Sequence, residues 1–245
     1  VMAPTTLKFL ESFPLGRAAR CLDVGCGGGD VTVALSRMVP QGHVTGIDFD
    51  GSKVLLAQQE ASALGIENVD FRAEDVTVNP QSDERYDLIY VRFVLTHLRD
   101  PERALRRFYD QLKPGGMLAV EDIDFGSHIC YPPSASFDRY VDLYSQSARA
   151  RGCDPFIGPR LPSLIQSAGY SDVSVGIVQP SGTSGEVKLI AAITFDAIAE
   201  SILNSGLETS ENIRATSNAL YEFSQQPGSF MSVPRIFQCR GIRGY

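Results

Sequence analysis

A glycine-rich loop near the N-terminus is the first stretch whose residue types and spacing could do chemistry. Residues 22–32 read LDVGCGGGDVT, an apolar run that leads through Gly25 and Gly27 into a helical pattern. Glycines between a strand and a helix let a ligand approach the backbone closely, and a helix N-terminus presents free N–H groups. The loop therefore predicts a ligand site at this helix.

The residue at position 30 narrows the choice of ligand. In a dinucleotide-binding loop with the spacing Gly-x-Gly-x-x-Gly, counted from Gly25, a third glycine would stand where this chain has Asp30. A carboxylate there would repel a pyrophosphate, and the absence of a Lys-Ser or Lys-Thr pair after the glycines excludes a P-loop. A ligand without phosphates, made of a nucleoside and a charged amino-acid tail, suits the loop better. S-adenosylmethionine is such a ligand.

The elements that must position this loop alternate along the first half of the chain. Strand patterns lie at 19–24, 43–47, 69–72, 86–91 and 117–121. Helical patterns lie at 30–38 and 52–64, and Asp100-Pro101-Glu102 predicts the start of a third helix. Strands alternating with helices at this spacing imply right-handed crossovers, so the sequence predicts a doubly wound, mostly parallel α/β sheet.

The second half of the chain is less regular. Helical patterns lie at 137–150, 161–168, 188–203 and 210–223, and strand patterns at 173–178 and 233–239. The last two helices form an insertion between the last two strands. Insertions at the active edge of a sheet commonly cover a binding site, so we expect a helical lid at about 188–225.

Several segments together resemble a known family. LDVGCGGG resembles the first signature of class I S-adenosylmethionine-dependent methyltransferases, and VTGIDFD, VDFRAEDV, YDLIYVRFVLTHL and LKPGGMLAVEDID follow in the family's order and spacing. The resemblance covers about residues 18–125. It implies a seven-stranded, mostly parallel, Rossmann-like sheet in a single domain over 1–245, with residues 1–125 as the cofactor-binding half and 126–245 as the acceptor-binding half.

The resemblance implies roles for residues at the ends of the first two strands. Asp23, Gly25 and Gly27 would shape the pocket for the methionine part of the cofactor, whose ammonium group needs acceptors. Asp48 would accept hydrogen bonds from both ribose hydroxyls. Phe49 would lie against the adenine ring.

Residues after the third and fourth strands complete this expected cofactor site. Asp75 would accept a hydrogen bond from the adenine amino group, with the Val76 amide nearby and Glu74 as an alternative to Asp75. Arg92 follows the fourth strand directly and would lie near the methionine end, with a role in a surface ion pair as the alternative. His97, in the same loop, would shape the cofactor end of the pocket.

The residues after the fourth strand also bear on the methyl acceptor. Enzymes that methylate amino groups of nucleic acids usually carry an Asn-Pro-Pro-Tyr-like motif there, whereas this chain has Val91-Arg92-Phe93-Val94. The overall pattern is most similar to small-molecule enzymes of the ubiquinone/menaquinone-biosynthesis type and to natural-product methyltransferases. We therefore expect methyl transfer to an oxygen or nitrogen atom of a small molecule.

A hydroxyl acceptor would benefit from a general base. His128 is the candidate because it follows the fifth strand by a few residues and imidazole titrates in a suitable range. Glu121, Asp122 and Asp124 at the end of that strand suggest a magnesium site, but alternation along a strand points Asp122 away from Glu121. We expect no metal there, and polar contact with the acceptor instead.

Composition and charge argue against several other classes of protein, among them nucleic-acid-binding and membrane-spanning proteins. The net charge of −7 argues against binding nucleic acid over a broad surface, and the basic residues Arg103, Arg106 and Arg107 are interpreted as a solvated helix face. No apolar run is long enough to span a bilayer, and the N-terminus lacks a signal-peptide pattern. The five cysteines include no C-x-x-C pair, which favours reduced thiols and a cytoplasmic location.

Two other functions stay open at the level of sequence. One is a NAD(P)-dependent oxidoreductase on a Rossmann sheet, which Asp30 disfavours. The other is a protein that keeps the cofactor pocket but has no transferase activity. The sequence does not determine the acceptor or the oligomeric state, and a homodimer is one arrangement that it allows.

Overall fold

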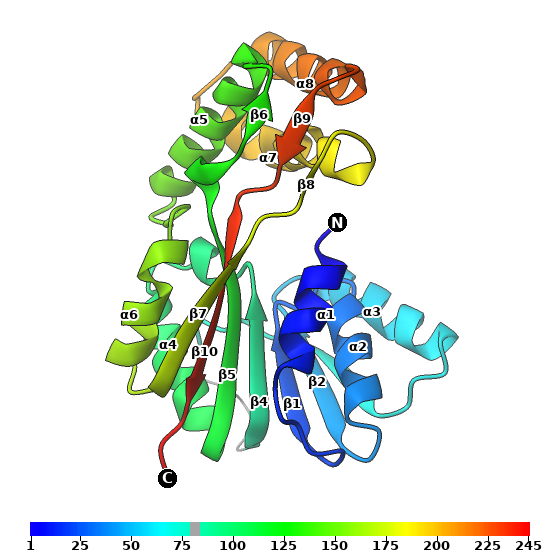
Figure 1. Ribbon diagram of the computed structural model, residues 1–245, viewed down its shortest axis with the longest axis vertical. Coiled ribbons are helices and arrows are strands. Elements are labelled where there is room, and N and C mark those ends of the chain that lie inside the picture. The colour runs from blue at the N-terminus through cyan, green and yellow to red at the C-terminus, as the bar shows by residue number, and fades with distance from the viewer. Residues whose placement is uncertain (79–83) are drawn as a thin grey trace.

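A seven-stranded sheet forms the centre of the molecule (Figure 1), as seen in a computed structural model that describes residues 1–78 and 84–245. Its strand order is β3-β2-β1-β4-β5-β10-β7. The strands are β1 Arg20–Val24, β2 His43–Asp48, β3 Val69–Ala73, β4 Tyr86–Arg92, β5 Leu112–Asp124, β7 Ser171–Val178 and β10 Arg235–Ile242. The pairs among β1 to β5 are parallel, and β10 is antiparallel to both neighbours. The predicted fold class is confirmed.

Helices cover both faces of the sheet because its strands alternate apolar side chains between two cores. On one face, Leu88 of β4 packs with α1 (Ala3–Glu11) and α2 (Asp30–Met38). On the other face, Ile89 packs with α4 (Pro101–Gln111) and α6 (Leu161–Ser167). The remaining helix of this part is α3, Gly51–Ala63.

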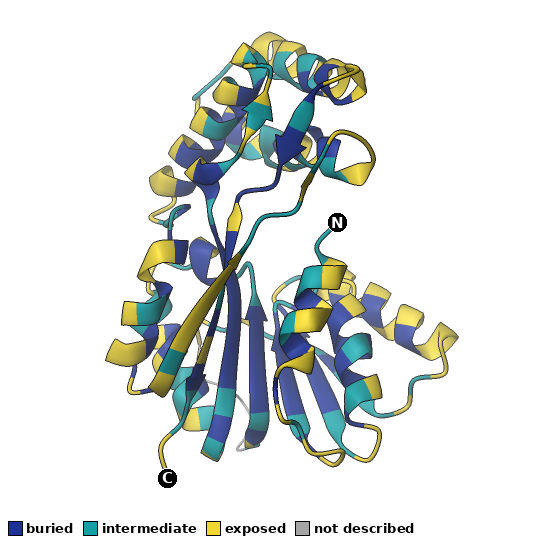
Figure 2. Cartoon of the chain, in the orientation of Figure 1, coloured by how far each residue is buried: buried dark blue, intermediate teal, exposed yellow. Residues whose placement is uncertain are grey.

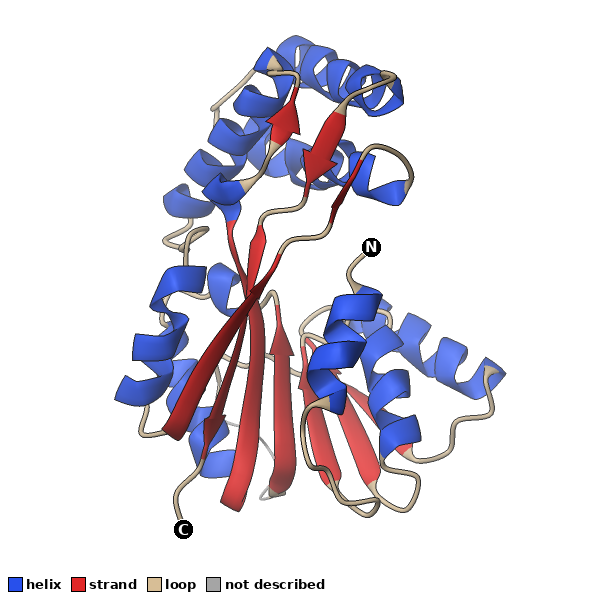
Figure 3. Ribbon diagram, in the orientation of Figure 1, coloured by secondary structure: helices blue, strands red, loops and turns tan. Residues whose placement is uncertain are grey.

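A second layer lies beyond the carboxyl ends of the parallel strands (Figures 1 and 3). It contains the helices α5 Ala135–Ala150, α7 Ile190–Asn204 and α8 Ser210–Gln225, and the short strands β6 Cys130–Tyr131, β8 Ser181–Gly182 and β9 Phe230–Ser232. Tyr140, Phe195 and Leu220 lie in its separate apolar core, which Figure 2 shows as buried segments facing one another. The two helices between β7 and β10 are therefore part of a packed layer with α5.

Side-chain caps fix where several helices begin. Asp50 accepts a hydrogen bond from the Ser52 N–H at the start of α3, and Asp100 accepts one from the Arg103 N–H at the start of α4. Pro at the first position of α4 costs no hydrogen bond, because that N–H has no helical partner in any case. The predicted start of α4 is confirmed.

The structure also contains elements that the sequence patterns did not indicate. They are α1, the three short strands β6, β8 and β9, and the 3-10 turns η1 Leu95–His97, η2 Phe125–Ser127, η3 Gly158–Arg160 and η4 Glu186–Lys188. The strand β5 begins at Leu112 rather than Met117, directly after α4. No helix in the described part of the chain has both the length and the apolar character needed to cross a membrane.

Candidate functional site

The glycine loop is held against the end of β2 by backbone hydrogen bonds. The N–H groups of Gly25 and Cys26 donate to the Ile47 carbonyl over 2.8 and 2.9 Å, and the Gly27 N–H donates to Asp48 Oδ2 over 3.0 Å. Gly25 has a φ of +72°, and a Cβ atom there would lie 2.4 Å from a methyl carbon of Val94. Only glycine satisfies both the left-handed backbone and the close approach.

Asp48 connects the glycine loop to the loop after β2. Its side chain is buried, with Oδ1 accepting from the Asp50 N–H and Oδ2 accepting from the Gly27 N–H. Each carboxylate oxygen can accept a further hydrogen bond, so a pair of hydroxyls can still bind. Phe49 beside it is 78 % exposed, which leaves a large aromatic face open to a ligand.

Asp23 lies fully buried beneath the glycine loop. Its Oδ2 accepts a hydrogen bond from the Thr32 hydroxyl of α2 over 2.6 Å. Burial raises the pKa of Asp23 to about 6, although the Thr32 hydroxyl and the positive charge of Arg92 oppose the rise. A cationic group nearby would stabilise the ionised carboxylate.

Arg92 and Asp30 form an ion pair directly after the glycine loop. The Arg92 guanidinium lies 3.1 Å from both carboxylate oxygens of Asp30, the first residue of α2. The sequence placed Asp30 as a group that disfavours phosphate, but not as the partner of Arg92. The pair links the start of α2 to the end of β4. Phe93, which follows, has a φ of +55° and packs against the core of the second layer.

The loop after β3 lies beside a cavity. Val76 and Thr77 line a cavity of about 370 Å³ together with His97 and Leu98 from the loop after β4. Asp75 is exposed, and its Oδ1 accepts from the Thr77 N–H over 2.8 Å. Glu74, the alternative to Asp75, is half-buried, and its N–H donates to the Asp48 carbonyl over 2.9 Å.

Arg107 corrects the prediction of a solvated basic face on α4. Its guanidinium is half-buried and donates to the Val76 carbonyl over 3.0 Å, which ties α4 to the loop after β3. Arg106 pairs with Glu102 one turn away at the surface, as expected of a solvated face. No local sequence pattern indicates this contact of Arg107, because its partner is a backbone oxygen 31 residues away in the chain.

His97 lines the cavity, where part of its ring is exposed to solvent and the rest is shielded by the surrounding protein. The pKa of His97 is lowered by burial, with repulsion from Arg151 and Lys53 adding to the effect. Asp122 holds the 3-10 turn that carries His97, because its Oδ2 accepts from the Thr96 N–H over 3.0 Å. Burial raises the pKa of Asp122 to about 7.

The prediction of polar contact with the acceptor is wrong for two of the three carboxylates at the end of β5, Glu121 and Asp122. Glu121 is buried and accepts hydrogen bonds from the hydroxyls of Thr6 and Tyr90 and from the amide of Gln238. Asp122 is occupied by backbone N–H groups on the other side of the strand. Both carboxylates are therefore satisfied by protein groups. No cluster suited to a metal ion is found in the described ranges 1–78 and 84–245.

His128 lies in an aromatic cluster of the second layer. Its ring makes edge contacts with Phe125, Phe137 and Tyr140, and Nδ1 lies 2.6 Å from the Phe125 carbonyl. Since a carbonyl only accepts, Nδ1 carries the hydrogen and Nε2 keeps a free lone pair. Nε2 is buried and has no hydrogen-bond partner within the described residues. Burial lowers the pKa of His128 to about 4.

The structure thus brings most of the sequence-predicted site residues to one edge of the sheet. Asp23, Gly25, Gly27 and Asp48 are connected directly by hydrogen bonds or through the glycine loop, and Arg92 reaches the start of the helix that follows this loop. Val76 and His97 share a cavity. His128 lies apart from this group. Its ring contacts Phe125, Phe137 and Tyr140, which belong to the apolar core of the second layer.

Comparison with known families agrees with this geometry. A family model described as a methyltransferase domain matches residues 15–146. Phosphoethanolamine N-methyltransferase 1 of Arabidopsis thaliana is 32 % identical over 69 % of this chain, and the match covers 32 % of that enzyme. The chain therefore spans about a third of the length of the plant enzymes that it matches. Malonyl-acyl-carrier-protein O-methyltransferase of Bacillus cereus is 27 % identical over 97 % of this chain and 80 % of its own.

Solved structures show the same fold over the whole chain. Phosphoethanolamine N-methyltransferase 2 of Haemonchus contortus, in complex with phosphomonomethylethanolamine and S-adenosylhomocysteine, superposes with a TM-score of 0.64 at 17 % identity. This match covers 99 % of the present chain and 53 % of that enzyme. Together with the family match, the glycine loop and the strand-end carboxylates, these findings show that the chain belongs to the family of S-adenosylmethionine-dependent methyltransferase domains.

Proposed function

We propose that the protein binds S-adenosylmethionine at the glycine loop and transfers its methyl group to an oxygen or nitrogen atom of a small molecule. The observation that carries the proposal is the arrangement at the end of β2. Asp48 has lone pairs left for ribose hydroxyls, and Phe49 presents an open aromatic face beside it. A nucleoside fits these two groups together.

Each end of the cofactor has candidate partners in this arrangement. Asp23, Gly25 and Gly27 would bind the methionine part, with Arg92 holding the start of α2. Val76 and His97 line the cavity that would take the adenine, where Asp75 would accept from its amino group. Methyl transfer needs an in-line approach to a donor that is already activated, so alignment can supply much of the acceleration.

A small acceptor is favoured by charge and by the relatives. The net charge of −7 opposes binding of a polyanion over a broad surface. Relatives carry the names phosphoethanolamine N-methyltransferase, malonyl-acyl-carrier-protein O-methyltransferase and trans-aconitate 2-methyltransferase, and they differ in the atom methylated. The family match does not favour the NAD(P)-dependent alternative.

We also propose that the second layer covers the acceptor and that residues 126–245 form the acceptor-binding half. Phe93 supports this, because it lies next to Arg92 and packs against the apolar core of that layer. Hydrogen exchange in residues 188–225 should slow when cofactor and acceptor are both bound. Equal exchange in all states would count against a lid.

His128 is kept as the candidate base for a hydroxyl acceptor. Its free Nε2 lone pair can take a proton, although a pKa of about 4 makes it a weak base. If it serves as the base, His128→Asn should lower kcat by about 10²-fold or more and leave cofactor affinity unchanged. An unchanged kcat would assign the transfer to proximity alone, which suits a neutral amine.

The free state of all five cysteines fits a reducing, cytoplasmic location.

The decisive experiment is a transfer assay with S-adenosylmethionine that carries a deuterated methyl group. Phosphoethanolamine, a malonyl thioester and trans-aconitate are the first acceptors to try, and mass spectrometry detects the labelled product. A [4+2]-cyclase, SpnF, has the same fold with a TM-score of 0.60, so the fold by itself does not establish transfer. Binding without a labelled product across a broad panel of acceptors would contradict the proposed activity.

A matched pair of variants tests the site. Phe49→Ala should weaken cofactor binding by about tenfold, because an aromatic contact is worth roughly 0.5–1.5 kcal/mol beyond the area that it buries. Phe49 is exposed, so the folded state should be unaffected. Leu64→Ala is the control, since Leu64 is also an exposed apolar residue and follows the last turn of α3. Equal affinities for the two variants would place the adenine elsewhere.

A further inference from the structure

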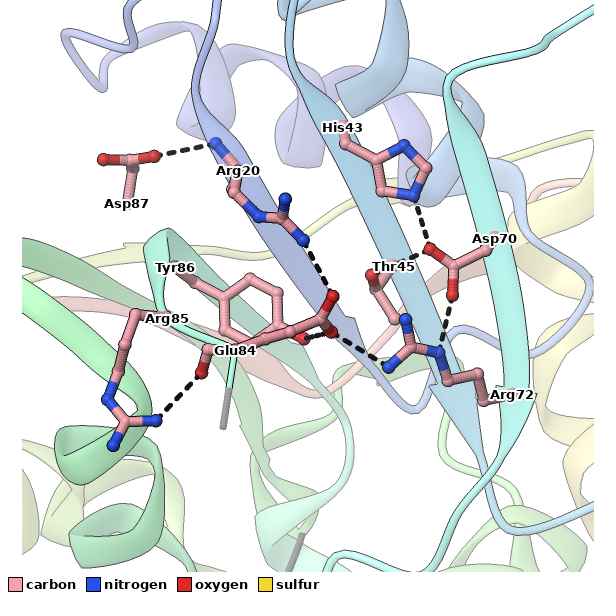
Figure 4. Close-up of polar contacts among 9 residues, drawn as sticks. All are labelled: Arg20, His43, Thr45, Asp70, Arg72, Glu84, Arg85, Tyr86 and Asp87. Atoms are coloured by element: carbon pink, nitrogen blue, oxygen red, sulfur yellow. Dashed lines mark hydrogen bonds and ion pairs between the residues drawn. The ribbon is translucent and has the colours of Figure 1, made fainter. Parts of the chain in front are cut away.

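The two edges of the main sheet are protected very differently. At one edge, β3 carries Asp70 and Arg72, and Figure 4 shows them in a polar network with neighbouring strands. Arg72 pairs with Asp70 over 2.7 Å and with Glu84 over 2.9 Å. Charged side chains along an edge strand are a common way of preventing another strand from pairing with it.

The other edge, β7, has no such protection over most of its length. Its sequence is SDVSVGIV, in which Asp172 is the single charged residue. Six of its eight residues are exposed, including Val175 at 49 % and Ile177 at 54 %. One side of the strand pairs with β10, and the sheet has no strand beyond it within the described residues.

The exposed side chains of Val175 and Ile177 continue the apolar core to the edge of the sheet. Val175 is in register with Cys239 and Ile177 with Phe237, so they lie on the face that α4 and α6 cover. The helix α6 has seven residues and is about 10 Å long, whereas the eight residues of β7 span about 26 Å. The helix is therefore too short to cover the whole strand.

We propose that β7 pairs antiparallel with β7 of a second copy, which makes one continuous sheet through a two-fold axis. In a register centred on Gly176, each Val175 faces the Ile177 of the other copy and the two glycines face each other. A Cβ atom at Gly176 would meet nothing within 4 Å, so the face of the sheet is open at the centre of this register. Asp172 never faces its own counterpart in registers centred on 174, 175 or 176, so pairing brings no like charges together.

This dimer is independent of the proposed methyl transfer, because none of the individual residues proposed to contact the cofactor or to act as the base lies on β7. Sedimentation equilibrium of the full chain should show a monomer–dimer equilibrium. Ile177→Lys should weaken dimerisation more than about tenfold, because it removes apolar contacts and places two ammonium groups near the axis. Leu64→Lys is the matched control, since Leu64 is also 54 % exposed and lies far from β7 in the fold.

Two further measurements keep the proposal testable if Ile177→Lys folds poorly. Backbone exchange of residues 171–178 in the unmodified chain should slow as concentration rises, and Gly176→Cys should form a disulfide-linked dimer on mild oxidation. A monomer at every concentration would overturn the proposal. So would a dimer whose β7 amides exchange independently of concentration, because that dimer would use another surface.

Discussion

Replacing His128 with Asn tests how the protein keeps an imidazole ring uncharged. Burial lowers the pKa of this ring from 6.5 to about 4 in the folded chain. The unfolded chain therefore takes up a proton below about pH 6.5, whereas the folded chain does so only near pH 4, so acid favours unfolding. Asn keeps an N–H where Nδ1 donates to the Phe125 carbonyl, but it does not titrate.

The size of the effect follows from the two pKa values. Stability from the neutral ring is fully present above about pH 6.5 and is lost as the pH falls towards about 4. One pKa unit is worth about 1.36 kcal/mol, so the whole shift corresponds to about 3.4 kcal/mol. Between about pH 7.5 and about pH 5, the wild-type chain should lose about 2 kcal/mol more unfolding free energy than His128→Asn.

Urea unfolding followed by circular dichroism at the two pH values measures this difference. The buried carboxyls of Asp23 and Asp122 also titrate, but both chains contain them, so their contributions cancel in the comparison. The same pH dependence in both chains would refute the reasoning, because the ring would then be as free to protonate in the folded state as in the unfolded state.

Three further outcomes follow from the site. Asp48→Ala should weaken S-adenosylmethionine binding by about 1.5–3 kcal/mol, the scale of hydrogen bonds to charged groups, and calorimetry showing unchanged affinity in a folded variant would remove the ribose assignment. Because the pKa of Asp23 is about 6 and the cofactor ammonium prefers the ionised carboxylate, affinity should fall up to about tenfold for each pH unit below that value. A cofactor affinity that calorimetry finds independent of pH would mean that the Asp23 carboxylate does not interact with the ammonium group. Activity should survive EDTA, since protein donors occupy both Glu121 and Asp122; loss restored by Mg²⁺ would contradict this.

The parts of the fold that could be predicted from the sequence depend on local patterns. The span of α2 and the start of α4 agree with the structure, because a glycine loop and the Asp100-Pro101 pair mark helix ends through backbone geometry. The strands β6, β8 and β9 have two or three residues each, which is too short for any periodic pattern. The helix α1 could not be predicted from apolar periodicity alone, partly because one of its two buried residues, Thr6, is polar. Its hydroxyl donates a hydrogen bond to Glu121.

The residues of the candidate site also fall into those that a local motif predicts and those that only the folded chain brings together. Gly25 and Asp48 could be predicted from the glycine-loop and second-strand motifs, because both residues form hydrogen bonds within these two segments. The pair of Arg92 with Asp30 and the bond from Arg107 to Val76 join segments distant in sequence, and no local pattern encodes such contacts. The surroundings of His128 are also set by tertiary packing, which brings together rings from η2 and α5.

The position of β10 in the sheet has a consequence for how the chain folds during synthesis. The last strand in sequence lies between β5 and β7, so both of those strands keep an unpaired edge until residues 235–242 have left the ribosome. Long-range pairing of this kind is slow, and exposed edges invite aggregation in the meantime. A nascent chain that stalls within α8 therefore leaves the facing edges of β5 and β7 unpaired, and such edges make a partly folded chain prone to aggregation.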